Sequence, residues 1–147
     1  MIATERVLRE VVRSIEVARI VPLGHHLSIL PMTDPLATAL ADVDGPELDE
    51  FWEAPPGLGL LLATGSISGP VAYVEAEYFG GTGTQCAQVW DAGEVVLGPT
   101  RSSAPDGATP ISRALRQLGV IRTSSDEFDA VDLGRHRRTA DWLPPFQ

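Results

Sequence analysis

The sequence contains no lysine and no asparagine, and all eleven of its basic residues are arginine. Without a lysine amine the chain cannot form a Schiff base with a carbonyl substrate, and it has no Walker-type lysine to hold a nucleotide phosphate. The lysine-containing cores of common metal-dependent nucleases are excluded for the same reason. Composition alone therefore removes several classes of enzyme.

Cysteine and long hydrophobic runs are also scarce. Cys86 is the only cysteine, so no internal disulfide can form, which fits a reducing compartment. The longest apolar run, residues 58–63, is far shorter than the roughly 20 residues that a membrane-spanning helix needs. The N-terminus leads into charged residues rather than into the core of a signal peptide. We expect a cytoplasmic protein with no membrane partner.

Positive charge is missing from the whole middle of the chain. The 81 residues between Arg19 and Arg101 contain no basic residue other than histidine, but they hold eleven carboxylates, from Asp34 to Glu94. The net charge of the whole chain is −9. A field of this sign repels phosphate backbones and anionic membranes and attracts basic partners. We therefore expect no nucleic-acid partner, and a basic protein as the partner that fits best.

The pattern of apolar residues predicts one α+β domain over residues 1–147 with a partly irregular C-terminal tail. An antiparallel β-meander at about residues 58–98 is expected to pack against N-terminal and C-terminal helices. Asp34 and Thr109 are the predicted caps of two of these helices. Segment 58–64 suits either a buried strand or a packed helix. The other predicted elements are helices over residues 3–20, 34–40, 109–119 and 125–131, a helical turn within 46–52, and a strand over 25–30.

Residues 70–98 contain three alternating segments separated by glycine-rich turns, which is typical of a meander. If residues 80–83 form the first turn, Glu77 lies opposite Cys86, Glu75 opposite Gln88 and Tyr73 opposite Trp90. One face of the hairpin is then polar and aromatic and the other is apolar, because side chains alternate along a strand.

The candidate site is this polar and aromatic face, with Tyr73, Glu75, Glu77, Gln88 and Trp90 as its residues. Two carboxylates on one strand face, about 6 to 7 Å apart, could carry out acid and base chemistry, hold a divalent cation or receive an arginine of a partner. The simpler alternatives are a solvated sheet face, or carboxylates paired with arginines of the later helices. Tyr73 and Trp90 favour protein binding, since aromatic residues beside charges are typical of interfaces.

Other motifs do not indicate a cofactor or a metal. The glycine-rich stretch 80–84 has no following helix or lysine, so a hairpin turn explains it better than a phosphate loop. In the stretch 65–69 isoleucine stands where a hydrolase elbow needs serine. His25 and His26 are adjacent and would point to opposite faces of a strand, and no cysteine accompanies them. We predict no metal site and no cofactor.

A compact cationic cluster lies near the C-terminus, at Arg135, His136, Arg137 and Arg138. Three guanidinium groups within four residues could bind an anion or nucleic acid. The acidic stretch DEFD (126–129) lies close by in sequence, and pairing of the cluster with the protein's own acidic region is the simpler interpretation.

Five stretches of the sequence are AYVEAEYFGG (72–81), ALRQLGV (114–120), DEFD (126–129), GRHR (134–137) and DW (141–142). Together they resemble a group of small, acidic, uncharacterised actinobacterial proteins. The resemblance extends over roughly residues 58–143, and it implies no activity and no functional residue because that group has no established mechanism. In size, acidity and α+β plan the chain is also similar in general to immunity proteins of bacterial toxin systems.

Three hypotheses follow. The first is an immunity-type binding module, a toxin inhibitor that neutralises a basic toxin or effector through the acidic and aromatic face. The second is a small hydrolase or lyase that uses the Glu75 and Glu77 pair. The third is a structural domain that forms a homodimer through Tyr73 and Trp90. The acidic field favours the first, and so favours a protein that is not an enzyme.

Overall fold

The computed structural model describes residues 1–13, 15–45, 48, 50–79, 82–102, 109–120, 131, 133 and 142. Within them, six strands form one antiparallel sheet in the order β2-β3-β1-β4-β5-β6. The strands are β1 (Ile2–Thr4), β2 (Val21–Pro22), β3 (Leu27–Ile29), β4 (Val71–Phe79), β5 (Thr82–Asp91) and β6 (Glu94–Ser102). The helices are α1 (Glu5–Val11), α2 (Asp34–Leu40), α3 (Leu58–Gly65), the 3-10 turn η1 (Ser66–Ser68) and α4 (Pro110–Gln117).

The predicted α+β class, with a meander packed against helices, is confirmed. Strands β4, β5 and β6 are the meander, which begins at Val71 because residues 58–65 form helix α3 rather than a strand. The first predicted helix is much shorter than expected: α1 ends at Val11, where a run rich in β-branched residues follows, and such residues are poor helix formers. The predicted helix at 125–131 lies outside the described residues, apart from Val131.

Threonine residues are the N-caps of three of the helices. Thr4, Thr33 and Thr109 each accept a hydrogen bond from a backbone N–H in the first turn of the helix that follows. The predicted cap at Thr109 is confirmed, with Pro110 in the first turn. For α2 the cap is Thr33, one residue before the expected Asp34, which occupies the first helical position and adds negative charge there.

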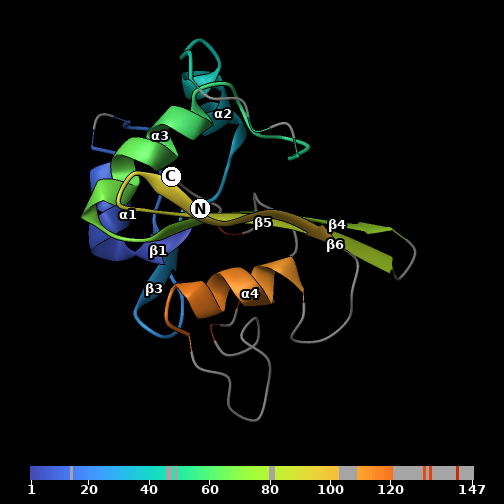
Figure 1. The fold of residues 1–147 in the computed structure, drawn as a ribbon. Coiled ribbons are helices and arrows are strands. Elements are labelled where there is room, and N and C mark those ends of the chain that lie inside the picture. Colours follow the sequence, from blue (N-terminus) through green and yellow to red (C-terminus); the bar gives the residue numbers. More distant parts are fainter. Residues whose placement is uncertain are drawn as a thin grey trace.

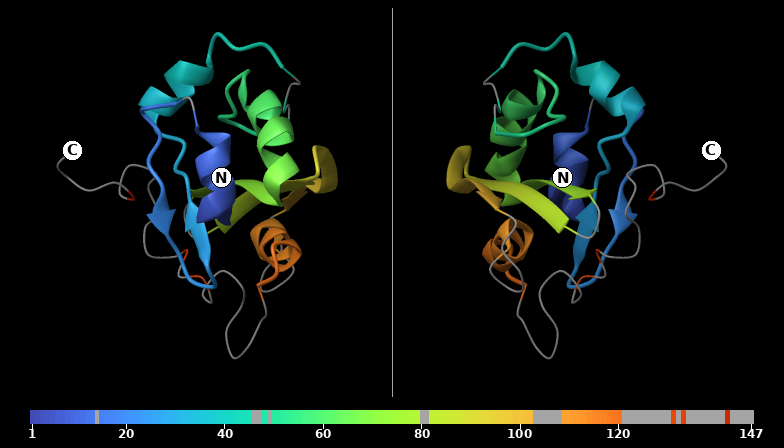
Figure 2. Two further views of the ribbon diagram at one scale, coloured as in Figure 1. Left: turned by 90° about the vertical axis from the view of Figure 1, so that its left-hand side faces the viewer. Right: turned by 90° about the vertical axis from the view of Figure 1, so that its right-hand side faces the viewer.

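The molecule has three layers, with helices on both faces of the sheet (Figure 1). Helices α1, α2 and α3 share one core with β4 and β5, and α4 packs on the opposite face of the same strands. The side views in Figure 2 show α4 on the side of the strands opposite to α1 and α3. Amphipathic elements must bury their apolar sides, and a sheet covered on both faces satisfies this need.

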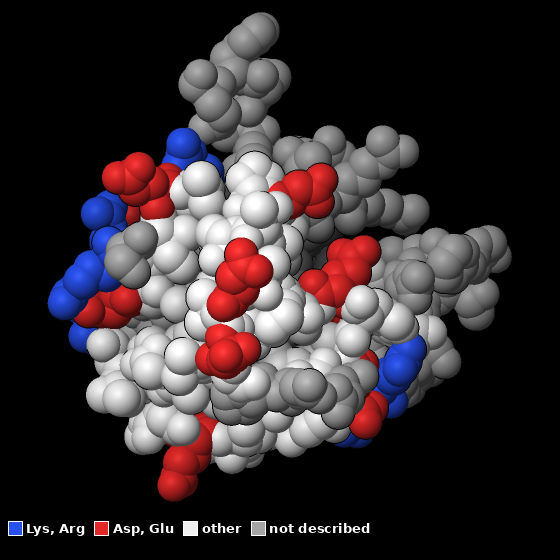
Figure 3. Space-filling model, turned by 90° about the horizontal axis from the view of Figure 1, so that it is seen from above, with Lys and Arg blue, Asp and Glu red and all other residues white. Residues whose placement is uncertain are grey.

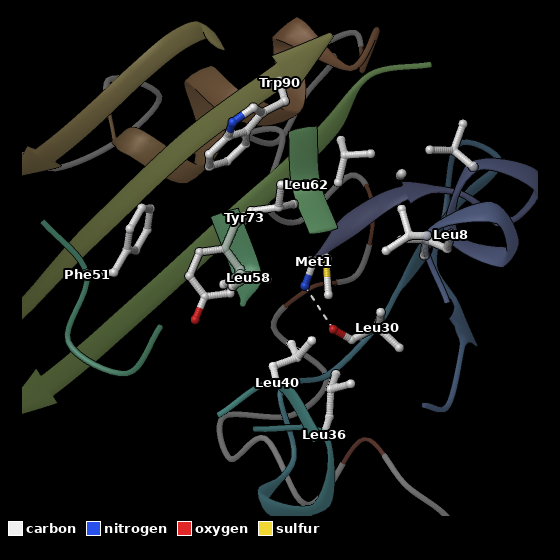
Figure 4. Packing of buried hydrophobic residues seen from close by; sticks show 14 of the residues in the cluster. Met1, Leu8, Leu30, Leu36, Leu40, Phe51, Leu58, Leu62, Tyr73 and Trp90 are labelled. Carbon is white, nitrogen blue, oxygen red and sulfur yellow. Dashed lines mark hydrogen bonds between the residues drawn. The ribbon is translucent and has the colours of Figure 1, made fainter. Parts of the chain in front are cut away.

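The larger core lies between the sheet and the first three helices (Figure 4). Leu8, Leu36, Leu58 and Leu62 are completely shielded from solvent and point into it. The amino group of Met1 is also buried there and donates a 2.8 Å hydrogen bond to the carbonyl of Leu30. Burial lowers the pKa of this amino group to about 5, although the nearby Glu75 carboxylate acts in the opposite direction.

Helices α1 and α3 approach closely at Gly65. A Cβ atom added at Gly65 would overlap Cγ2 of Val11 and lie 3.2 Å from its Cβ. Valine is stiff at χ1, so its methyl group cannot move aside freely. Glycine at 65 is therefore required by the distance between the two helices.

We expect Gly65→Ala to lower the free energy of unfolding by about 1 to 3 kcal/mol, the usual cost of an overpacked core. The loss should be smaller in a Val11→Ala background, where the overlapping methyl groups are gone. Thr64→Ala, at the exposed neighbouring position, is the control and should change stability by less than about 0.5 kcal/mol. Urea unfolding of the four variants measures this. An equal cost of Gly65→Ala in both backgrounds would contradict the steric explanation.

Candidate functional site

The residues of the predicted site do share one face of the hairpin, but in a different register. Val71 pairs with Trp90, Tyr73 with Gln88 and Glu75 with Cys86. The predicted pairs are wrong by two residues because the strands continue to Phe79 and Thr82, leaving a shorter turn than expected. A shift of two residues leaves every side chain on its predicted face, since the period of a strand is two.

The prediction that this face is an open, adhesive surface is wrong. Tyr73, Trp90 and Gln88 are only 1%, 4% and 7% exposed. Figure 4 shows Tyr73 and Trp90 beneath α3, among Leu58, Leu62 and Phe51. In this fold Tyr73, Gln88 and Trp90 are therefore not placed to touch a partner protein.

Glu75 is the half-buried polar group at the edge of this core, and its carboxylate accepts hydrogen bonds from three groups. The backbone N–H of Trp52 donates to Oε1 at 2.6 Å. The N–H of Glu53 donates to Oε2 at 3.1 Å, and the hydroxyl of Tyr73 donates to the same oxygen at 2.5 Å. We call this arrangement the Glu75 clamp. Hydrogen bonds to an ionised carboxylate are about twice as strong as those between neutral groups.

Three further contacts hold the segment 50–53 against the sheet. The rings of Phe51 and Tyr73 meet edge to face, with centroids 4.8 Å apart. The thiol of Cys86 donates to the carbonyl of Glu50 at 3.5 Å. The guanidinium of Arg101 lies 4.4 Å from the centroid of the Trp52 ring. With the clamp, these contacts fix the segment across the end of the core.

Titration of the neighbouring groups follows from this environment. Burial, followed by the charge of Glu75 and its hydrogen bond, raises the pKa of Tyr73 far above its ordinary value, so its hydroxyl stays a donor. Burial and then the charge of Glu75 raise the pKa of Cys86 to about 11, although Arg101 acts in the opposite direction. Cys86 is consequently a neutral thiol and a poor nucleophile at neutral pH.

The clamp resembles a structural anchor more than an acid or base. Both Glu75 oxygens already accept hydrogen bonds from groups that are fixed by the fold. The carboxylate is therefore poorly placed to accept a proton from a substrate. The side chain of Glu77 lies outside the described part of the molecule. His25 and His26 are exposed in a turn before β3, not on a strand as expected. Across the described ranges no group of three or more His, Cys, Asp or Glu side chains could hold a metal ion.

Sequence reasoning did not identify Phe51, Trp52 and Arg101 as neighbours of Glu75. The aromatic pair at 51 and 52 beside Glu53 was the available signal, but nothing local indicates that its N–H groups face a carboxylate 22 or 23 residues later. Arg135, His136, Arg137 and Arg138 lie outside the described residues, so their pairing with the acidic region stays a prediction.

Exposed carboxylates gather around α2 and the segment that follows it. We call Asp34, Asp42, Asp44, Glu50 and Glu53 the acidic surface, and all five are exposed. Figure 3 looks down on this side of the molecule, where red atoms lie over a white surface and blue atoms lie at the margins. The two ion pairs among the described residues join Arg9 to Glu5 and Arg13 to Glu10, and neither includes a member of this surface.

No family model matches the chain, and no curated protein or solved structure is significantly similar to it. Among the described helices, none is both long enough and apolar enough to cross a membrane. The function must therefore be argued from the geometry of the surface.

We expect Glu75→Gln to lower the free energy of unfolding by about 1 to 3 kcal/mol, because two charge-assisted bonds are lost and an amide N–H is turned toward a donor. Glu53→Gln, at an exposed carboxylate of the same segment, is the matched control and should cost less than about 0.5 kcal/mol. Chemical denaturation gives both values. Equal effects of the two substitutions would show that the clamp contributes no more to the free energy of unfolding than an exposed carboxylate does.

We expect the Cys86 thiol to resist disulfide-exchange reagents in the folded protein, because it is fully buried and its pKa is about 11. Labelling should become rapid and stoichiometric when denaturant unfolds the chain. A colorimetric thiol assay at mildly alkaline pH, with and without denaturant, measures both rates. Fast labelling of the folded chain would contradict the burial of this residue.

Proposed function

We propose that this chain is a protein-binding module that holds a basic protein against its acidic surface. The observation that carries the proposal is the group of five exposed carboxylates without an ion pair among the described residues. The negative charges of these carboxylates repel each other in the free protein, and a basic partner relieves this repulsion. The proposed binding surface is thus displaced from the buried hairpin face to α2 and the segment 42–53.

An immunity-type role fits this proposal best among modules of this size. Such a protein would cover the basic face of a toxin or effector. Complementary charge would make association fast and sensitive to salt, with association rates well above those of neutral pairs.

The two alternative functions have less support. A hydrolase or lyase that used Glu75 would have to give up the hydrogen bonds that hold segment 50–53 in place. Self-association through Tyr73 and Trp90 would need two residues that are buried in the core. Each alternative therefore requires a rearrangement that binding at the acidic surface does not.

We expect the immobilised full chain to retain basic proteins from a lysate of the cells that produce it, and to release them as salt rises and the Debye length falls below about 5 Å. The triple variant Asp42→Asn, Asp44→Asn, Glu50→Gln should bind the retained protein at least about tenfold more weakly, mainly through slower association.

The matched control is Glu5→Gln, Glu10→Gln, Glu16→Gln, which changes the net charge equally but at residues of α1 and the turn after it. It should retain most of the affinity, since only the long-range field is altered. Surface plasmon resonance at several salt concentrations measures both variants. The proposal would be contradicted if no basic protein were retained, or if binding did not depend on the salt concentration.

A further inference from the structure

Large apolar side chains are exposed along the outer side of α3, beside the acidic surface. Ile67 is 73% exposed and Leu60 is 42% exposed. Leu60 and Thr64 lie on one side of α3, four residues apart, and Ile67 follows three residues later in the 3-10 turn η1, which continues that side. The Thr64 hydroxyl donates to the Leu60 carbonyl at 2.9 Å, which satisfies the only polar side chain of the three within the helix itself.

The apolar side chains continue beyond both ends of α3. At one end, Val43 packs over Gly57, and the backbone of Gly45 lies against Leu60. At the other end, the β5–β6 turn is tied to η1, where the N–H groups of Ala92 and Gly93 donate to Ser66 at 3.0 Å.

Val95 follows this turn on β6, on the sheet face of its partner Trp90, which α3 covers. We call Val43, Leu60, Ile67 and Val95 the α3 stripe; each is at least 37% exposed.

A helix that is apolar on every side is normally buried on every side. The sequence of α3, LGLLLATG, has no charged residue, but only its inner side, with Leu58 and Leu62, is covered. Contiguous exposed apolar surface of this kind marks interaction sites in soluble proteins. The α3 stripe is therefore an apolar surface that no described segment covers.

Charged residues at the ends of the stripe determine which partner fits. Asp42 and Asp44 flank Val43 at one end, and Glu94 precedes Val95 at the other, all three exposed. No lysine or arginine occurs anywhere between residues 20 and 100. Arg6 adds one positive charge near Ile67, where its guanidinium donates to the carbonyl of Ser68 at 3.2 Å. The three carboxylates outweigh it, so the rim of the stripe repels nucleic acids and anionic membranes and attracts cationic side chains.

We propose that the α3 stripe is the docking site for a basic amphipathic helix of the partner protein. Leu60 and Ile67 are seven residues apart, a span of about 11 Å that matches about two turns of a docked helix. Leu60 and Ile67 contact the apolar side of that helix, and its lysine and arginine side chains reach Asp42, Asp44 and Glu94. This inference rests on the proposed function and names the chemistry of the partner.

The test uses the full chain and synthetic peptides of about four helical turns. The first peptide contains leucine and lysine at amphipathic helical spacing, and the second has the same composition in shuffled order. A third has glutamate in place of lysine. Fluorescence anisotropy should give the tightest binding for the first, with the shuffled peptide at least about tenfold weaker and the acidic peptide not bound.

Leu60→Ser with Ile67→Ser should weaken the first peptide by at least about tenfold and leave the shuffled peptide unchanged. Val17→Ser is the control, because Val17 is exposed to a similar extent, 41%, but lies in the segment after α1 and outside the stripe. Thermal unfolding of each variant checks that these exposed positions do not alter the fold. Asp42→Asn with Asp44→Asn should weaken both basic peptides.

The outcomes separate this inference from the proposed function. Equal binding of both basic peptides, unaffected by the serine substitutions, would overturn the α3 stripe but support the acidic surface. Binding of neither basic peptide would overturn both. Binding to phosphatidylcholine vesicles instead of the peptides, or a concentration-dependent dimer that Leu60→Ser disrupts, would show that a membrane or a second copy occupies the stripe.

Discussion

The arrangement of this molecule depends on how the Glu75 carboxylate is hydrogen-bonded, since the ion pairs among the described residues do not include it. A half-buried carboxylate is costly unless hydrogen bonds replace water, and the usual arginine or lysine partner is absent from residues 20 to 100. Backbone N–H groups of Trp52 and Glu53 and the hydroxyl of Tyr73 take that role. The clamp has a structural consequence, because it draws the segment 50–53 over the core and leaves the side chains of Glu50 and Glu53 exposed. The same interaction thus closes the core and builds part of the acidic surface.

Helix α3 has the opposite feature, which is apolar surface exposed to solvent rather than a half-buried charge. Its inner side fills the core that the clamp closes, but no described segment covers the apolar residues on its outer side. A threonine, glutamate or arginine at such exposed positions would cost the helix little stability. An apolar outer side is therefore a cost in solubility without a gain in the stability of the isolated chain. Binding of the proposed partner would supply the gain.

Much of the fold could be predicted from local patterns. Strict alternation placed Tyr73 and Glu75 on one hairpin face, and Thr109 with Pro110 marked the start of α4. The register could not be predicted, since a row of glycines near residue 80 permits a turn of two or of four residues. Burial of the face with Tyr73 was missed for a different reason: Glu75 and Gln88 suggest a solvated surface. The groups that satisfy Glu75 come from a distant segment whose position only the folded chain determines.

The acidic surface and the α3 stripe would contribute to different steps of one binding reaction. Charges act at a distance of about one Debye length, near 8 Å at physiological salt, so they act before the surfaces touch and chiefly raise the association rate. Apolar side chains act only in contact, and they slow dissociation by excluding water from the interface. A partner with charge at one end alone would be steered to the surface but would gain little orientation. A helix with cations placed to reach both ends would be held in one orientation over Leu60 and Ile67.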